Sequence, residues 1–175
     1  GSINTISWHM NHPVTGGDSW DTTPGVSAIL PGGAKHSLYK DWLDIFADFL
    51  SDLTGERGEY IPIIFRPFHE HTGSWFWWGD NQTSIEDYRA IWIFTLEYLR
   101  DQKGIHHLIY AYSPDGGGGY HFQDYMKKYP GDTYVDILGF DDYASFMRDT
   151  SRVEELSAEL GQIVEWAREK DKIAA

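Results

Sequence analysis

Apolar residues are spaced along the chain in two ways, one typical of amphipathic helices and one typical of buried strands. Steps of three and four residues predict helices over residues 38–53, 84–104 and 151–170. Ser84 and Ser151 each stand three residues before an acidic residue, a pattern that marks helix N-termini. Between the helices lie short apolar runs that we interpret as buried strands, namely Ile3–Trp8, Tyr60–Phe65, His107–Tyr112, Val135–Phe140 and Lys172–Ala175.

The helical spacing also predicts which side chains face the core. The first helix is expected to bury Leu38, Trp42, Ile45, Phe46, Phe49, Leu50 and Leu53. The second helix is expected to bury Tyr88, Ile91, Trp92, Leu96 and Leu99. The third helix is expected to bury Val153, Leu156, Leu160, Ile163, Val164 and Ala167.

Strands that alternate with helices predict an α/β fold with a parallel sheet. Polar or aromatic residues follow each of the first four strands, and ligands bind over the carboxyl ends of strands in open parallel sheets and in (β/α)8 barrels alike. A complete barrel needs about 250 residues. These 175 residues provide four strand–helix units and the beginning of a fifth strand. We therefore expect a partial (β/α)8 TIM barrel, in a single catalytic domain over residues 1–175 that is truncated at both ends.

Composition narrows the class of ligand. The chain holds eight Trp, eleven Tyr and nine Phe, more than core packing alone usually requires, and aromatic rings stack on both sugars and bases. A net charge of −13 would repel a phosphate backbone, which disfavours nucleic acid and favours a neutral polysaccharide. The absence of Cys argues against thiolate metal sites, and no apolar run is long enough for a membrane span. We expect neither a metal nor a cofactor.

The segment with the clearest chemical signal runs from Arg66 to Gly79 and reads RPFHEHTGSWFWWG. It places Glu70 just after a predicted strand and before a run of aromatic residues. Such surroundings raise the pKa of a Glu, and glycoside hydrolysis needs one carboxylic acid that stays protonated near neutral pH. One alternative is a buried ion pair between Arg66 and Glu70, with the Trp residues as core. A zinc site is disfavoured because His69 and His71 lack the helical spacing of zincins.

A glycine-rich segment follows the third predicted strand. Ser113, Pro114 and Asp115 precede four glycines, but the segment lacks both the lysine of a phosphate-binding P-loop and the spacing of a dinucleotide motif. We interpret it as a mobile surface loop and give Asp115 no catalytic role.

Three motifs resemble those of glycoside hydrolase family 26, whose best-known members are endo-β-1,4-mannanases built on a (β/α)8 barrel. The segment from Arg66 to Gly79 is similar to the family's acid/base motif after the fourth strand. Residues 8–13, with the sequence WHMNHP, and residues 140–143, with the sequence FDDY, are similar to its third-strand and sixth-strand segments. The resemblance implies that the chain covers roughly strands 3 to 7 of the barrel.

The resemblance also implies roles for single residues. Glu70 matches the general acid/base of a retaining, double-displacement mechanism. His9 and His69 match residues that line the subsite of the distorted sugar, although a structural role would also explain His9. The remaining matches are Trp75 as an aromatic platform, Tyr143 as the Tyr that bonds the nucleophile, Trp20 as either a subsite wall or a loop anchor, and Asp141 and Arg66 as further residues of the substrate site.

The family's nucleophile is expected shortly beyond Ala175, because Lys172–Ala175 is similar to the beginning of the seventh strand. These residues alone are therefore expected to be inactive. The parent protein is expected to hydrolyse β-1,4 bonds within mannan, galactomannan or glucomannan. The alternatives are a related β-glycanase that cuts mixed-linkage glucan or β-1,3-xylan, and a glycan-binding protein without catalysis. Such a substrate implies a secreted, periplasmic or cell-surface protein.

Overall fold

The computed structural model describes residues 3–116, 121–143 and 153–175, and its sheet has five parallel strands. The strands pair in the order in which they occur along the chain. They are β1 (Asn4–Ser7), β2 (Ile63–Arg66), β3 (Leu108–Tyr112), β4 (Ile137–Leu138) and β5 (Ile173–Ala174). Every predicted strand is confirmed, with shorter bounds than the apolar runs suggested.

The predicted long helices are confirmed as well. They are α2 (His36–Asp52), α3 (Ile85–Glu97), which continues as a π-helical turn η1 (Tyr98–Gln102), and α6 (Val153–Glu169). The Ser84 side chain accepts a hydrogen bond from the Asp87 backbone N–H at 3.0 Å, as the capping pattern predicted. Ser151, the expected cap of α6, lies outside the described residues. Shorter helical segments are α1 (Val26–Ile29), α4 (Phe122–Met126) and the 3₁₀ turn η2 (Asp132–Tyr134).

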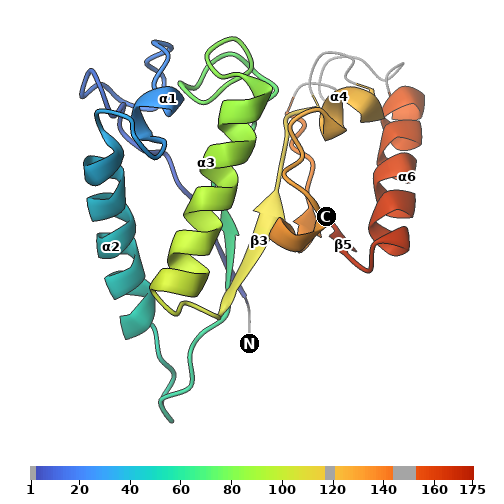
Figure 1. Cartoon of the computed structure of the whole chain (residues 1–175). Coiled ribbons are helices and arrows are strands. Elements are labelled where there is room, and N and C mark those ends of the chain that lie inside the picture. The colour runs from blue at the N-terminus through green and yellow to red at the C-terminus, as the bar shows by residue number, and fades with distance from the viewer. Residues whose placement is uncertain (1–2, 117–120, 144–152) are drawn as a thin grey trace.

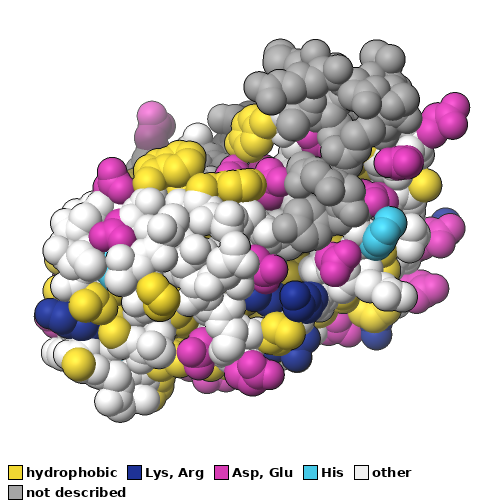
Figure 2. Space-filling model, turned by 90° about the horizontal axis from the view of Figure 1, so that it is seen from above, with side chains coloured by type: hydrophobic (Ala, Val, Ile, Leu, Met, Phe, Trp, Pro, Cys, Tyr) yellow, Lys and Arg dark blue, Asp and Glu magenta, His cyan; other side chains and the backbone are white. Residues whose placement is uncertain are grey.

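A strand order that follows the chain is the order of a singly wound barrel, because a doubly wound sheet reverses direction part-way. In Figure 1, α2 and α3 stand side by side in front of the sheet, and α6 stands next to β5. Strand β3 points toward the end of the molecule where α1 and α4 lie. The loops that follow the parallel strands therefore gather at that end. Figure 2 shows this face, where hydrophobic side chains lie beside several Asp and Glu side chains.

Predictions of burial are wrong in three places: the two edge strands, part of α6 and part of α2. The first and last strands were expected to be buried, but β1 has no fully buried residue and Ile173 of β5 is 57% exposed. The reason is that β1 and β5 are the two edges of the described sheet. In α6, Val153 and Val164 are also exposed, whereas the buried residues of this helix are Leu156, Glu159, Ile163 and Ala167.

Helix α2 buries only part of the face that its apolar residues indicated: Leu50 is buried as expected, and Trp42 and Phe46 are partly buried against the core. Ile45 and Phe49 are 69% and 50% exposed, and the buried residues are Tyr39, Leu43, Ala47 and Leu50. Tyr39 lies on the buried side, where its hydroxyl is 2.6 Å from the Thr95 hydroxyl of α3. The inward side of α2 thus carries a polar contact to α3 in addition to its apolar packing.

Candidate active site

The chain turns sharply after β2, and this turn presents Glu70. Phe68 and Glu70 both have left-handed backbone angles, with φ of 49° and 53°. Such angles are uncommon for residues with a side chain and must be held by surrounding contacts. The Glu70 N–H donates to the Ser113 carbonyl at 2.7 Å, and the Gly73 N–H donates to the Glu70 carbonyl at 3.0 Å. The turn is therefore tied both to itself and to the end of β3.

Glu70 lies half-buried at the carboxyl end of the sheet, in surroundings suited to a proton donor. Burial raises the pKa of the Glu70 carboxyl, and the negative charge of Asp141 raises it further. Hydrogen bonds from Trp75 and Tyr143 and the charge of Arg66 act in the opposite direction. The Trp75 indole N–H donates to Glu70 Oε2 at 3.1 Å. This bond holds the carboxyl in one orientation toward the cleft.

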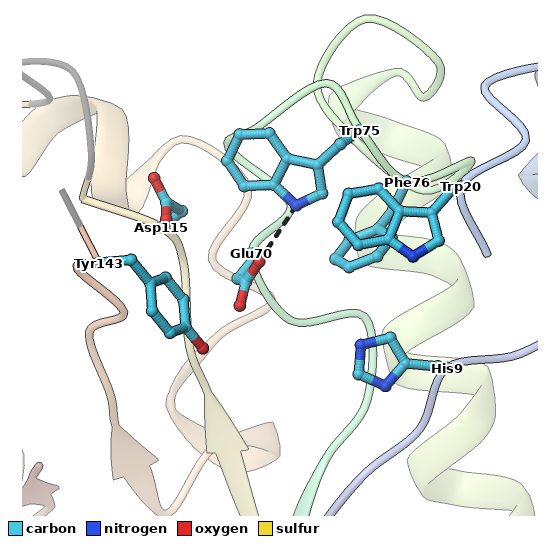
Figure 3. A pocket seen from close by; sticks show the side chains of 7 residues that line it. All are labelled: His9, Trp20, Glu70, Trp75, Phe76, Asp115 and Tyr143. Atoms are coloured by element: carbon cyan, nitrogen blue, oxygen red, sulfur yellow. Dashed lines mark hydrogen bonds between the residues drawn. The ribbon is translucent and has the colours of Figure 1, made fainter.

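Glu70 opens into a cleft of about 610 Å³, within the range of small-molecule sites. Figure 3 shows it between Tyr143 and Asp115 on one side and His9, Trp20 and Phe76 on the other. The rings of Trp20 and Phe76 lie 5.0 Å apart, although the two residues are far apart in sequence. Trp20 is 60% exposed. The cleft thus combines a carboxyl group with exposed aromatic surface, as a sugar site does.

Two histidines meet at the floor of the cleft. The Nε2 atoms of His9 and His69 are 3.2 Å apart, with His69 buried behind the exposed His9. Burial, together with the neighbouring His9 and Arg66, lowers the pKa of His69 to about 3. His69 is therefore neutral at physiological pH and can share a single proton with His9.

Arg66 and Asp141 form an ion pair beneath the cleft rather than in its lining. The guanidinium also donates to the Ser7 hydroxyl at 3.0 Å and to the Ser113 hydroxyl at 3.1 Å. Ser113 in turn donates to Asp141 Oδ2 at 2.6 Å. This cluster joins the ends of four neighbouring strands. Arg66 therefore pairs with Asp141 and not with Glu70, so the alternative of a buried Arg66–Glu70 pair is wrong.

Of the predicted site residues, the cleft brings together His9, Trp20, Glu70, Trp75 and Tyr143. His69, Arg66 and Asp141 lie behind or below them. Sequence reasoning missed two lining residues, Phe76 and Asp115. Phe76 stood unassigned within the aromatic run, and Asp115 follows the carboxyl end of β3 as Glu70 follows that of β2.

The segment around Asp115 also needs a correction, because it is not a surface loop over its described part. Residues 113–116 are buried. The Thr72 hydroxyl donates to the Asp115 carbonyl at 2.7 Å, and the Gly116 N–H donates to the Asp141 carbonyl at 2.7 Å. These bonds dock the segment between two strand ends. The predicted loop at Gly117–Gly119 lies outside the described residues.

Comparison with known proteins agrees with this geometry. The profile of glycosyl hydrolase family 26 matches residues 1–170. The chain belongs to glycosyl hydrolase family 26. It is 39% identical to a mannan endo-1,4-beta-mannosidase of Bifidobacterium adolescentis over 98% of the chain and 19% of that protein. It is 36% identical to a mannan endo-1,4-beta-mannosidase of Bacillus subtilis over 90% of the chain and 44% of that protein.

Solved structures of family 26 share the fold. The chain superimposes on the catalytic domain of an endo-beta-1,4-mannanase of Bacillus sp. JAMB-750 with a TM-score of 0.93 and 41% identity, covering 98% of this chain and 45% of that one. A modular endo-beta-1,4-mannanase of Cellulomonas fimi gives a TM-score of 0.94 and 43% identity, covering 100% of this chain and 39% of that one. The chain thus spans less than half the length of these family members, and its sheet is part of a (β/α)8 barrel.

Two further observations concern metals and membranes. The described residues hold no group of three or more His, Cys, Asp or Glu side chains that could bind a metal ion. Among the helices in those same parts of the chain, none is both long and apolar enough to cross a bilayer.

Proposed function

We propose that this chain provides the acid/base half of the active site of a retaining endo-β-1,4-mannan hydrolase, with Glu70 as the general acid/base. The observation that carries the proposal is the position of Glu70, a half-buried carboxyl with a raised pKa that opens into an aromatic cleft at the carboxyl end of a barrel strand. The relatives named above, which are mannan endo-1,4-beta-mannosidases, supply the substrate class.

The geometry suits the two tasks that Glu70 would perform. In the first step, the proton of the Glu70 carboxyl passes to the oxygen of the departing sugar while a second carboxylate attacks the anomeric carbon and forms a glycosyl-enzyme. In the second step, Glu70 removes a proton from water, which displaces that carboxylate from the sugar. We expect the second carboxylate to be a Glu on the barrel's seventh strand, shortly beyond Ala175 and about 5 Å from Glu70.

The other lining residues would hold the sugar. Trp75 presents its ring to the cleft while its N–H holds Glu70, so the platform and the acid are aligned by one side chain. Trp20 and Phe76 offer a second aromatic surface on the far side of Glu70. The His9–His69 pair and Tyr143 offer polar atoms for sugar hydroxyls or for the nucleophile. Because polymeric mannan does not enter cells, we propose that the protein acts outside the cytoplasm.

The test compares the natural full-length protein with its Glu70→Gln variant on galactomannan and on mixed-linkage β-glucan, with release of reducing sugar as the measurement. Glutamine keeps the shape of the side chain but cannot supply a proton, so activity on galactomannan should fall by about 100-fold or more. Glu165→Gln, on the exposed side of α6, is the matched control and should keep full activity.

The other functions correspond to other outcomes. Cleavage of the β-glucan in preference to galactomannan would indicate a related β-glycanase. Binding of galactomannan without any cleavage by the full-length protein would indicate a glycan-binding protein. Equal activity of Glu70→Gln and the unmodified protein would remove Glu70 from the catalytic role.

A further inference from the structure

The residue after the proposed acid/base, His71, lies at the centre of a buried polar network. His71 is fully buried, between α3 and β3. Its Nδ1 atom is 2.9 Å from the Tyr88 hydroxyl, and its Nε2 atom is 3.0 Å from the Tyr112 hydroxyl. None of these three side chains lines the cleft around Glu70. The mechanism above therefore gives them no role.

The network reaches the catalytic turn through a backbone carbonyl. The Tyr88 hydroxyl is 2.9 Å from the Phe68 carbonyl, to which it can donate. Phe68 has the first of the two left-handed backbone angles in the turn, and Glu70 has the second. On the other side, the Tyr112 hydroxyl is 2.8 Å from the carbonyl of Tyr125 in α4. His71 thus lies between one contact to the turn and one contact to a neighbouring helix.

Proton counting shows how these contacts depend on one another. Burial and the nearby Lys128 ammonium lower the pKa of His71 well below its ordinary value, so the ring is neutral. A neutral imidazole has one N–H, and each tyrosine hydroxyl has one proton. Three protons therefore serve these four contacts, and a hydrogen bond between the His71 ring and the Phe68 carbonyl, which raises the pKa of His71, competes for one of them.

The tautomer of His71 decides which contact lacks a proton. With the proton on Nδ1, His71 donates to Tyr88, and Tyr88 is then free to donate to the Phe68 carbonyl. Nε2 accepts from Tyr112 in that state. With the proton on Nε2, Tyr88 must donate to His71 instead, and the Phe68 carbonyl loses its bond.

We propose that His71, in the tautomer protonated on Nδ1 and acting through Tyr88, is a positioning residue that holds the left-handed turn at Phe68 and so aims Glu70 at the glycosidic oxygen. The inference rests on the proposed function of Glu70. Left-handed angles at residues with a side chain persist only where the surrounding structure enforces them. Other bonds also hold the turn, including that of the Trp78 indole N–H to the His69 carbonyl at 2.8 Å. Among the hydrogen bonds of the described residues, the one from Tyr88 joins the turn to α3.

The positioning role of His71 can be distinguished from a role in stabilising the fold by varying the leaving group of the substrate. Mannan has a poor leaving group that needs a proton from Glu70, whereas a dinitrophenyl β-mannobioside has a leaving group that departs without one. Misplacement of the Glu70 carboxyl should therefore lower kcat/KM for mannan and leave kcat/KM for the dinitrophenyl substrate nearly unchanged. A general loss of folded protein would lower both equally.

The experiment uses Tyr88→Phe in the natural full-length protein, with Tyr110→Phe as the matched control. Tyr110 is also a buried tyrosine, and among the described residues its hydroxyl has no hydrogen-bond partner. Tyr88→Phe should lower kcat/KM for mannan by about 10- to 100-fold, since a small misplacement of a catalytic group has effects of this size. For the dinitrophenyl substrate, kcat/KM of the Tyr88→Phe variant should fall by less than about threefold. Tyr110→Phe should leave both values unchanged.

Two further variants test the histidine itself. His71→Gln retains a donor and an acceptor, and His71→Leu retains neither, so the Gln variant should recover part of the activity on mannan that the Leu variant loses. Equal losses on both substrates, or no loss from Tyr88→Phe, would overturn the inference while leaving the proposed function intact. If the unmodified protein cleaved neither substrate, the proposed function would fail and the inference with it.

Discussion

The hydrogen bond from Trp75 to Glu70 predicts a measurable shift in the pH dependence of hydrolysis. Trp75→Phe keeps an aromatic ring in the cleft and removes the N–H that lies 3.1 Å from Glu70 Oε2. That N–H stabilises the charged carboxylate, and it lowers the pKa of Glu70. Its removal should therefore raise the pKa. A general acid is active when protonated, so the alkaline limb of the pH profile should move to higher pH.

The size of the shift follows from the contact. A hydrogen bond to a charged group contributes about 1.5 to 3 kcal/mol where solvent is excluded. Glu70 is only half-buried, and water can replace part of the lost bond. We therefore take about 1 kcal/mol, which corresponds to about 0.7 pH unit at 1.36 kcal/mol per unit. The quantity to measure is kcat/KM for mannan across the pH range, because it reports the pKa values of the free enzyme.

Trp20→Phe is the matched control, since it makes the same substitution in the same cleft. The Trp20 ring contacts Phe76, whereas the indole that donates to Glu70 is that of Trp75. It should weaken substrate binding without moving the alkaline limb. The reasoning is refuted if Trp75→Phe leaves the limb in place or moves it to lower pH, or if Trp20→Phe moves it to the same extent.

Two other predictions concern the same region and its surroundings. A Cβ added at Gly73 would overlap the Trp75 ring, so Gly73→Ala should lower the free energy of unfolding by about 1 to 3 kcal/mol. A Cβ added at Gly161 in α6 meets no atom within 4 Å, so Gly161→Ala should raise the free energy of unfolding by up to about 1 kcal/mol. Thermal unfolding of both variants would check this, and equal shifts would contradict it. The lowered pKa of His71 predicts a ring that is neutral near pH 7, and the proposed network predicts that its proton lies on Nδ1; NMR of ¹⁵N-labelled histidine measures both. A titration near pH 6.5 would contradict it.

The sequence predicted the elements well because their signals are local. Apolar runs and helical spacing depend on neighbouring residues, and all five strands and the three long helices were found. Burial was predicted less well, because it depends on what lies beside each element. The exposed Ile173 belongs to an edge strand, and the exposed Ile45 lies on the outward side of α2. Neither fact is encoded in the spacing itself.

The candidate site shows the same division. Glu70 was predicted because the sequence itself places a carboxyl residue between a strand and a run of aromatic residues. Asp115 was missed because its docking depends on bonds from Thr72 and from the strand end at Asp141, which are distant in sequence. The His71 network was missed for the same reason, since Tyr88 and Tyr112 are 17 and 41 residues away from it. Polar contacts between elements are the information that the sequence pattern lacks.

The aromatic run after Glu70 illustrates how one short segment can serve both as a scaffold and as a sugar-binding surface. Its three indole N–H groups point to three different acceptors. Trp75 donates to Glu70, Trp77 donates to the Met10 carbonyl beyond β1, and Trp78 donates to the His69 carbonyl in the turn. Trp77 and Trp78 are fully buried, whereas Trp75 remains partly open to the cleft. Because a buried indole must satisfy its N–H, Trp77 holds the loops after β1 and β2 together and Trp78 holds the turn after β2 to its own loop, so the outer ring can then align the acid with the sugar.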